Sequence, residues 1–185
     1  MSTKSPKVRE PLPAVYYYFF WLCEPALTLA GAEYAIRRPQ DYGSDMLPVG
    51  MERSTAGIGR TIRGQMIIGG LGSCFFLLAL ISLSLFPTIK RSLPDRPDIQ
   101  GRLAKALLIP LAIADISHIV MTLLPMPISF LQSPGKWTTL INGNVWITVF
   151  LFLIRSAYLL GIGRPHRPFS PNAGPALAEL EKKGQ

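Results

Sequence analysis

Five polar residues lie inside otherwise apolar stretches of this sequence, and their side chains are of the types that do acid–base chemistry. Glu24 lies in the first stretch, Asp115 and His118 in the third, and Asn144 and Arg155 in the fourth. An ionised side chain at the centre of a lipid bilayer costs about 3 kcal/mol or more unless it meets a partner or water. These residues are therefore candidates for a functional site at the centre of a membrane protein.

Glu24 is the first carboxyl of this set, and it is followed by Pro25. Proline removes a backbone donor and disfavours helical geometry at the preceding residue, so we expect a kink beside Glu24. One interpretation makes Glu24 a proton donor, because burial in an apolar medium favours the neutral acid. The other makes it a structural carboxyl that is paired with Arg155 or with a backbone donor.

Asp115 and His118 lie one helical turn apart on the same helix face. The functional interpretation is a hydrogen-bonded acid with an orienting imidazole. The structural interpretation is a hydrogen bond between helices, worth about 1 kcal/mol or less in a membrane. Two ligands do not make a metal site, and the second histidine, His166, lies in the C-terminal tail. We therefore expect no metal.

Arg155 and Asn144 are expected to support the acids. Arg155 is the counter-ion of Glu24 or Asp115, a clamp for an anionic substrate group, or a side chain that reaches the membrane interface. Asn144 belongs to an Asn-Gly-Asn sequence at 142–144. We expect it to hydrogen-bond across helices or to position the polar head of a substrate.

Aromatic residues lie in the same stretches, and aromatic faces stabilise cations. The candidates are Tyr16, Phe20 and Trp146. Tyr16, Phe20 and Glu24 follow the spacing i, i+4, i+8, which places them on one face of a helix. The alternative is that these rings face lipid or the membrane interface.

Four apolar runs must position these residues, and loops rich in charge, proline and glycine separate them. Each run approaches or exceeds the length of about 20 residues that a helix needs to span a bilayer. We expect helices at about 14–36, 66–87, 103–124 and 140–163. The predicted fold is an all-α membrane protein, with four transmembrane helices in one bundle over residues 13–163. Residues 1–12 are expected to be a disordered tail, and residues 164–185 a proline-rich tail.

The chain is basic, with 19 Lys and Arg against 11 Asp and Glu and a net charge of +8. The basic residues flank the apolar runs, which indicates membrane orientation and no nucleic-acid partner. With four spans, twelve basic residues lie on the side of the two termini and six on the other side. The positive-inside rule then places both termini in the cytosol. Cys23 and Cys74 lie in apolar runs, and we expect them to be small buried hydrophobes.

Several short segments stand out in order along most of residues 15–163, and both tails lack them. They are YFFWLCEPALTLAGA at 18–32, LLIPLAIADISH at 107–118, Trp137, NGN at 142–144 and RSAYLLGIG at 155–163. These segments resemble a fungal family of small four-span membrane proteins, and they are similar to integral-membrane terpene cyclases of meroterpenoid biosynthesis.

The resemblance implies a proton-initiated cyclisation of a farnesyl-type chain on an aromatic or epoxycyclohexenone head. Glu24 and Asp115 would be the catalytic acids, and the prenylated substrate would enter from the bilayer, in the endoplasmic reticulum. Such a reaction needs a neutral acid held away from water and no cofactor. The sequence shows no phosphate-binding loop, nucleophile elbow or dinucleotide fingerprint.

Two alternatives remain open. A lipid or sterol double-bond isomerase uses the same acid–base logic. A non-enzymatic tetraspan scaffold or lipid-binding protein would use the acids only to hold helices together.

Overall fold

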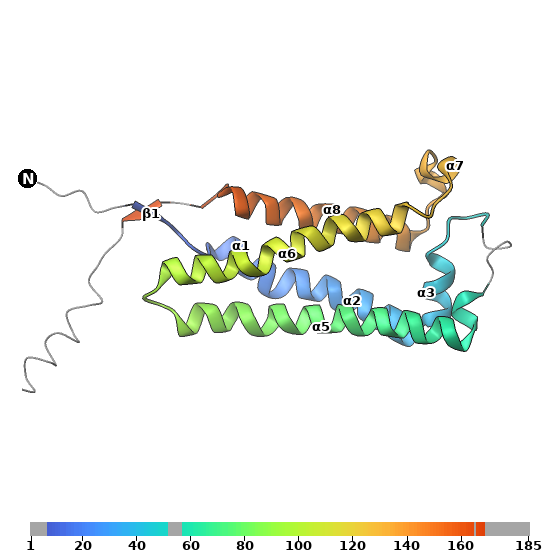
Figure 1. Cartoon of the computed structure of the whole chain (residues 1–185), viewed down its shortest axis with the longest axis horizontal. Helices are drawn as coiled ribbons and strands as arrows, with labels where there is room; N and C mark the ends of the chain where they lie inside the picture. Colours follow the sequence, from blue (N-terminus) through green and yellow to red (C-terminus); the bar gives the residue numbers. More distant parts are fainter. Residues whose placement is uncertain (1–6, 52–56, 165, 169–185) are drawn as a thin grey trace, which may run out of the picture.

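The computed structural model describes residues 7–51, 57–164 and 166–168, and shows an elongated bundle of helices (Figure 1). The predicted helical class is confirmed, since the described elements are helices apart from two three-residue strands. The segments that run along the bundle are α1 (Ala14–Tyr18), the π-helix η1 (Phe19–Cys23), α2 (Glu24–Arg37), α5 (Ile62–Ser92), α6 (Pro97–Leu123) and α8 (Thr139–Leu160). The others are α3 (Pro39–Asp45), η2 (Ile58–Arg60), α7 (Ile128–Leu131) and η3 (Pro134–Lys136).

Three of these helices, α5, α6 and α8, are long and apolar enough to cross a membrane. They contain 31, 27 and 22 residues. At a rise of about 1.5 Å per residue, even α8 is about 33 Å long. That length matches the hydrocarbon core of a bilayer, which is about 30 Å thick.

The first predicted helix is divided into α1, η1 and α2, which follow one another without a gap. The backbone N–H of Glu24 donates to the carbonyl oxygen of Phe19, five residues back, which is the hydrogen bond of a π turn. Glu24 itself has ordinary helical dihedrals, φ −62° and ψ −49°. Glu24 thus keeps helical geometry, which a following proline disfavours, and the irregularity that we expected beside it takes the form of a π turn. We attribute the difference to the wider turn before Pro25, which accommodates the proline.

The other helices differ from their predicted bounds. α5 continues through Pro87 to Ser92, although we expected it to end at the proline. The Thr88 hydroxyl, one residue after the proline, donates to the carbonyl oxygen of Ser84 at 2.7 Å. α6 starts at Pro97, earlier than predicted, because proline fits the first turn of a helix.

α8 ends three residues before the predicted limit. Gly161 follows its last residue, Leu160, with φ 82° and closes the helix in the left-handed conformation. At the start of α8, the Thr138 hydroxyl accepts a hydrogen bond from the backbone N–H of Ile141, at 3.3 Å. Both ends of this helix are thus set by local capping residues.

The helices pack in two pairs, α2 along α5 and α6 along α8. At Gly72 of α5, an added Cβ atom would lie 2.7 Å from Cγ1 of Ile36 and 3.1 Å from Cβ of Ala35. Such close approach of two backbones is typical of helix packing in membranes, where small residues take the place of large ones.

The two ends of the described chain lie side by side. Strand β1 (Lys7–Arg9) pairs antiparallel with strand β2 (His166–Pro168), at the end of the bundle where α5 turns into α6 (Figure 1). The Tyr158 hydroxyl donates to the carbonyl oxygen of Pro11 at 2.6 Å, and Nε of Arg164 donates to that of Glu10 at 3.0 Å. These bonds explain why residues 7–12, which we expected to be disordered, are ordered. The rest of the predicted tails, residues 1–6, 165 and 169–185, lies outside the described residues.

Candidate functional site

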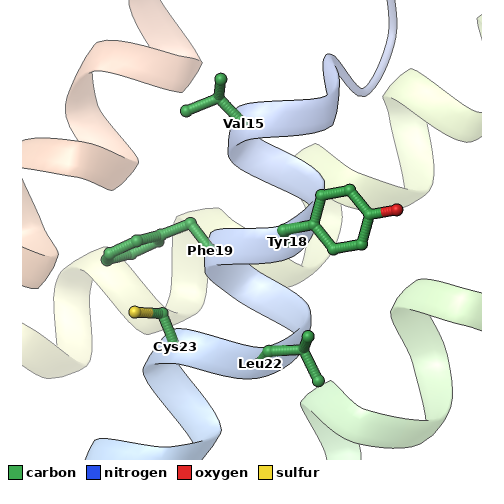
Figure 2. Close-up of a pocket in the computed structure, with 5 residues that line it drawn as sticks. All are labelled: Val15, Tyr18, Phe19, Leu22 and Cys23. Carbon is green, nitrogen blue, oxygen red and sulfur yellow. The ribbon is translucent and has the colours of Figure 1, made fainter.

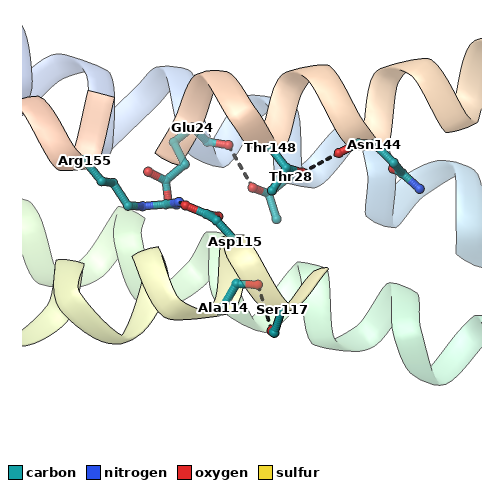
Figure 3. Close-up of polar contacts among 8 residues, drawn as sticks. All are labelled: Glu24, Thr28, Ala114, Asp115, Ser117, Asn144, Thr148 and Arg155. Atoms are coloured by element: carbon teal, nitrogen blue, oxygen red, sulfur yellow. Dashed lines mark hydrogen bonds and ion pairs between the residues drawn. The ribbon is translucent and has the colours of Figure 1, made fainter. Parts of the chain in front are cut away.

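Three of the predicted polar residues meet between the helix pairs. The Arg155 guanidinium on α8 lies 2.7 Å from Oε1 of Glu24 on α2. Its other terminal nitrogen donates to the Asp115 carboxylate on α6 (Figure 3). All three residues are buried, with exposed fractions of 3% for Arg155, 5% for Glu24 and 8% for Asp115. We call Glu24, Asp115 and Arg155 the triad. The predicted pairing of Arg155 with one carboxyl is thus realised with both.

Local sequence explains how each helix presents its residue. Asp115 continues a stripe of buried α6 residues, Ala104, Leu108 and Ala112, at the spacing of one helix face. Arg155 lies between buried Leu151 and Tyr158 on α8. Glu24 follows directly after the π turn, which sets its direction relative to α1.

The triad has an uneven charge balance. With both carboxyls ionised, two negative charges face one positive charge in an environment of low dielectric constant, where an unbalanced charge is costly. Among the described residues, Oε2 of Glu24 and Nε of Arg155 are buried and have no hydrogen-bond partner. Addition of one proton to either carboxyl would make the triad neutral, so the geometry suits a site that stores a proton.

His118 lies beside the triad without joining it. Its ring meets the edge of Phe75 on α5, with 6.1 Å between the ring centroids. Within the described part of the chain, the contacts of its side chain do not include the hydrogen bond to Asp115 that we expected. The imidazole is half-buried, and it connects α6 to α5.

Asn144 lies about 16 Å from Arg155 along α8, at a rise of about 1.5 Å per residue. Its side-chain amide nitrogen donates to the sulfur of Met46 at 3.2 Å, directly after α3. Of the two roles that we predicted for Asn144, this bond is closer to a hydrogen bond across helices than to a contact with a substrate head. Nearby, the Thr138 hydroxyl donates to the carbonyl oxygen of Asp45. Burial raises the pKa of the Tyr42 phenol in the same region. These contacts fasten α3 over one end of the bundle, away from the triad.

The predicted aromatic residues do not line a cavity together. Phe20 is fully buried, and its ring stacks on Phe86 with 5.6 Å between centroids and meets the edge of Tyr158 at 6.0 Å. Tyr16 packs in the same cluster, and its hydroxyl donates to the carbonyl oxygen of Ile162 at 2.8 Å. Trp146 is 60% exposed on α8 and belongs to the outer surface.

An apolar groove of about 440 Å³ lies on the outer side of α1 and η1 (Figure 2). It is lined by Val15, Tyr18, Phe19, Leu22 and Cys23. The triad is not part of its lining. Cys23 is exposed here, and Cys74 is exposed on α5, so the prediction that both are buried is wrong. Apolar residues face outward on helices that are surrounded by lipid, which the sequence pattern alone does not distinguish from burial.

The described residues contain no group of three or more His, Cys, Asp and Glu that could hold a metal ion. The sequence candidates did not include Met46, which anchors one end of the site region by its contact with Asn144. Tyr158, which anchors the other end, lies in the segment 155–163 quoted above, three residues after Arg155 on the same helix face.

The family described as Domain of unknown function (DUF7704) matches residues 9–165. The chain belongs to this family. The DUF7704 match includes the whole triad, the aromatic cluster and all the long helices. Among curated proteins and among solved structures, no match was found.

Proposed function

We propose that this DUF7704 member is a four-span membrane protein with both termini on the cytosolic side. The first span is Ala14–Arg37, which the π turn interrupts without breaking. Its 24 residues correspond to about 36 Å of helix, enough to cross the hydrocarbon core. The pairing of β1 with β2 beside the α5–α6 turn agrees with one common side for the segments that carry most of the basic residues.

The proposed activity is acid–base catalysis on an apolar substrate that dissolves in the bilayer. The triad carries this proposal, because two carboxyls from different helices share one guanidinium, and Oε2 of Glu24 has no hydrogen-bond partner in the described part of the chain. In this scheme one proton resides on the carboxyl pair and makes the triad neutral. Glu24 is the proposed proton donor, and Asp115 keeps Arg155 paired while the proton leaves.

The proposed reaction is the cyclisation of a farnesyl-type chain on a meroterpenoid precursor, in the endoplasmic reticulum. Its substrate class and its compartment rest on the resemblance of the sequence segments. Protonation of an olefin or epoxide by Glu24 would start ring closure, and the proton lost at the end would return to the carboxyl pair. The buried position of the triad supports this scheme, since a carbocation must be kept from water.

The packing sets a condition on this mechanism. Tyr16 and Phe20 fill the space at one end of the bundle, and the groove of Figure 2 lies outside it. A substrate must therefore enter between the helix pairs, and the Glu24–Arg155 contact must open for the acid to reach it. A double-bond isomerase for lipids or sterols would use the same acid under the same condition.

The close packing also favours a second candidate, a non-enzymatic tetraspan protein in which the triad only fastens helices. The observation behind it is that Phe20, Phe86 and Tyr158 are all fully buried in one cluster at the end of the bundle. A scaffold needs such packing, whereas an enzyme needs in addition a state that admits substrate.

Product analysis separates these functions. Microsomes that contain the protein would be incubated with a linear farnesylated phenol, a farnesylated epoxycyclohexenone and a sterol, and products would be followed by mass-resolved chromatography. A cyclase gives a product of unchanged mass and shifted retention from a linear substrate, and an isomerase gives it from the sterol.

Glu24→Gln is the decisive variant, and Glu33→Gln is the matched control. Glu33 is an exposed carboxyl on the same helix, 3.6 Å from Arg37. Loss of product with Glu24→Gln alone supports the proposal. Equal products from both variants would exclude Glu24 as the proton donor. No conversion of any of the three substrates by a well-folded protein would favour the scaffold.

A further inference from the structure

A cation lies near Tyr18, one of the residues that line the groove of Figure 2. Nζ of Lys90, in the last turn of α5, lies 3.8 Å from the ring centroid of Tyr17 and 5.8 Å from that of Tyr18. Lys90 is exposed, and Arg91 follows it. An apolar groove thus ends beside a positive charge that two aromatic rings hold in place.

The dimensions and composition of the groove suit a hydrocarbon chain. From Val15 to Cys23 it follows eight residues of helix, about 12 Å. Its volume lies within the range of about 300–1,000 Å³ that is usual for ligand sites. Because it opens outward on an exposed helix face, a molecule that already lies in the bilayer can enter it without crossing the bundle.

We propose that this groove binds an anionic phospholipid, with an acyl chain along Val15, Phe19 and Leu22 and the headgroup phosphate at Lys90. The groove places an apolar surface next to a positive charge, as a phospholipid places an acyl chain next to a negatively charged headgroup. Helix α1, which contains Val15, and the last turn of α5, which contains Lys90, both lie toward the bundle end that holds the α5–α6 turn (Figure 1). A headgroup sits at this level when its chain points inward. The inference does not depend on the chemistry of the triad.

The net negative charge distinguishes the proposed lipid from a zwitterionic one. A basic residue near a membrane surface favours anionic lipid by about fivefold. The preference for phosphatidylserine over phosphatidylcholine should therefore be about fivefold, and it should fall as salt screens the charges.

The two cysteines provide the test. Cys23 lines the groove and Cys74 is exposed on another helix, so Cys74 is an internal reference. The full chain in detergent would be treated with a methanethiosulfonate reagent and increasing phosphatidylserine, and modification of each cysteine would be followed by mass spectrometry. We expect phosphatidylserine to slow the modification of Cys23 at about one fifth of the concentration that phosphatidylcholine requires, with no difference between the lipids at Cys74.

Lys90→Gln should remove the preference, and Lys90→Arg should restore it. Lys136→Gln is the matched control, because Lys136 also lies near an aromatic ring, 5.7 Å from the centroid of Phe130, but away from the groove. An unchanged preference in Lys90→Gln, or equal protection by both lipids in the wild type, would overturn the proposal. Protection by farnesyl phosphate without protection by phosphatidylserine would overturn it too, and would assign the groove to an isoprenoid.

Discussion

The Arg155 guanidinium lies 2.7 Å from Oε1 of Glu24 and so joins the last long helix to the first. The same side chain binds Asp115 on α6. The two helix pairs, α2–α5 and α6–α8, are thus connected by one buried cation. The aromatic cluster connects them at one end, and the contacts of α3 with α8 connect them at the other.

Arg155→Gln should strongly destabilise the protein, because it leaves two buried carboxyls without a counter-ion. We expect a loss of about 3–5 kcal/mol, the cost of breaking a buried ion pair. The unfolding midpoint in detergent measures this loss. Arg102→Gln is the control, since Arg102 pairs with Asp98 at 3.0 Å with its side chain 79% exposed, and an exposed pair of this kind contributes little.

Removal of all three charges should recover much of that stability, because no unpaired charge remains. The triple variant Glu24→Gln, Asp115→Asn, Arg155→Gln is therefore expected to unfold later than Arg155→Gln alone. If the triple variant is no more stable than the single one, unbalanced charge is not the cause of the loss.

Gly72→Val should separate α2 from α5. Its side chain would meet Ala35 and the carbonyl oxygen of Ala32, which lies 3.2 Å from the position of the added Cβ. Overpacking of this kind costs about 1–3 kcal/mol. Gly69→Val is the matched control, because an added Cβ at Gly69 meets nothing within 4 Å. Thermal unfolding of both variants checks the prediction, and equal midpoints would speak against close packing at Gly72.

Pro25→Ala should fail to stabilise the protein, although removal of a proline inside a helix usually does. Alanine supplies the missing N–H and favours a regular α-helix, which removes the extra residue of the π turn. Phe20 would then rotate by about 100° relative to Glu24, so one of the two would lose its contacts. Pro110→Ala, inside α6, is the comparison and should be stabilising. A stability gain in both variants would mean that the π turn is dispensable.

The proposed four-span topology places Gly50 and the C-terminus on opposite sides of the membrane. An N-glycosylation acceptor inserted beside Gly50, in a position with open space around it, should receive a glycan in microsomes. The same acceptor appended to the C-terminus should not. A glycan at the C-terminus would contradict the proposed orientation.

The triad residues could be found from the sequence because a charge inside an apolar run stands out whatever the fold. Their pairing could not, since it depends on how α2, α6 and α8 cross. The i, i+4, i+8 spacing of Tyr16, Phe20 and Glu24 placed them on one face of a regular helix. The π turn between Phe20 and Glu24 changes that phase, and nothing in the spacing reveals it.

Helix ends were the least predictable part of the fold. Hydropathy marks the lipid-facing length of a helix, whereas α5 and α6 extend beyond it into basic segments at the α5–α6 turn. Only Leu93–Arg96 separates them, in place of a long loop. The ordered contacts of Pro11 and Glu10 were likewise hidden, because their partners, Tyr158 and Arg164, lie at the other end of the chain.

Infrared spectroscopy of the protein in lipid tests the central claim most directly, which is that the triad holds one proton. At neutral pH the account predicts a carbonyl band of a protonated carboxylic acid that is buried from exchange with deuterated water. The band should be lost or shifted in both Glu24→Gln and Asp115→Asn, and unchanged in Glu33→Gln. A spectrum in which the wild type shows only ionised carboxylates would contradict the account, and would leave the triad as a purely structural ion pair.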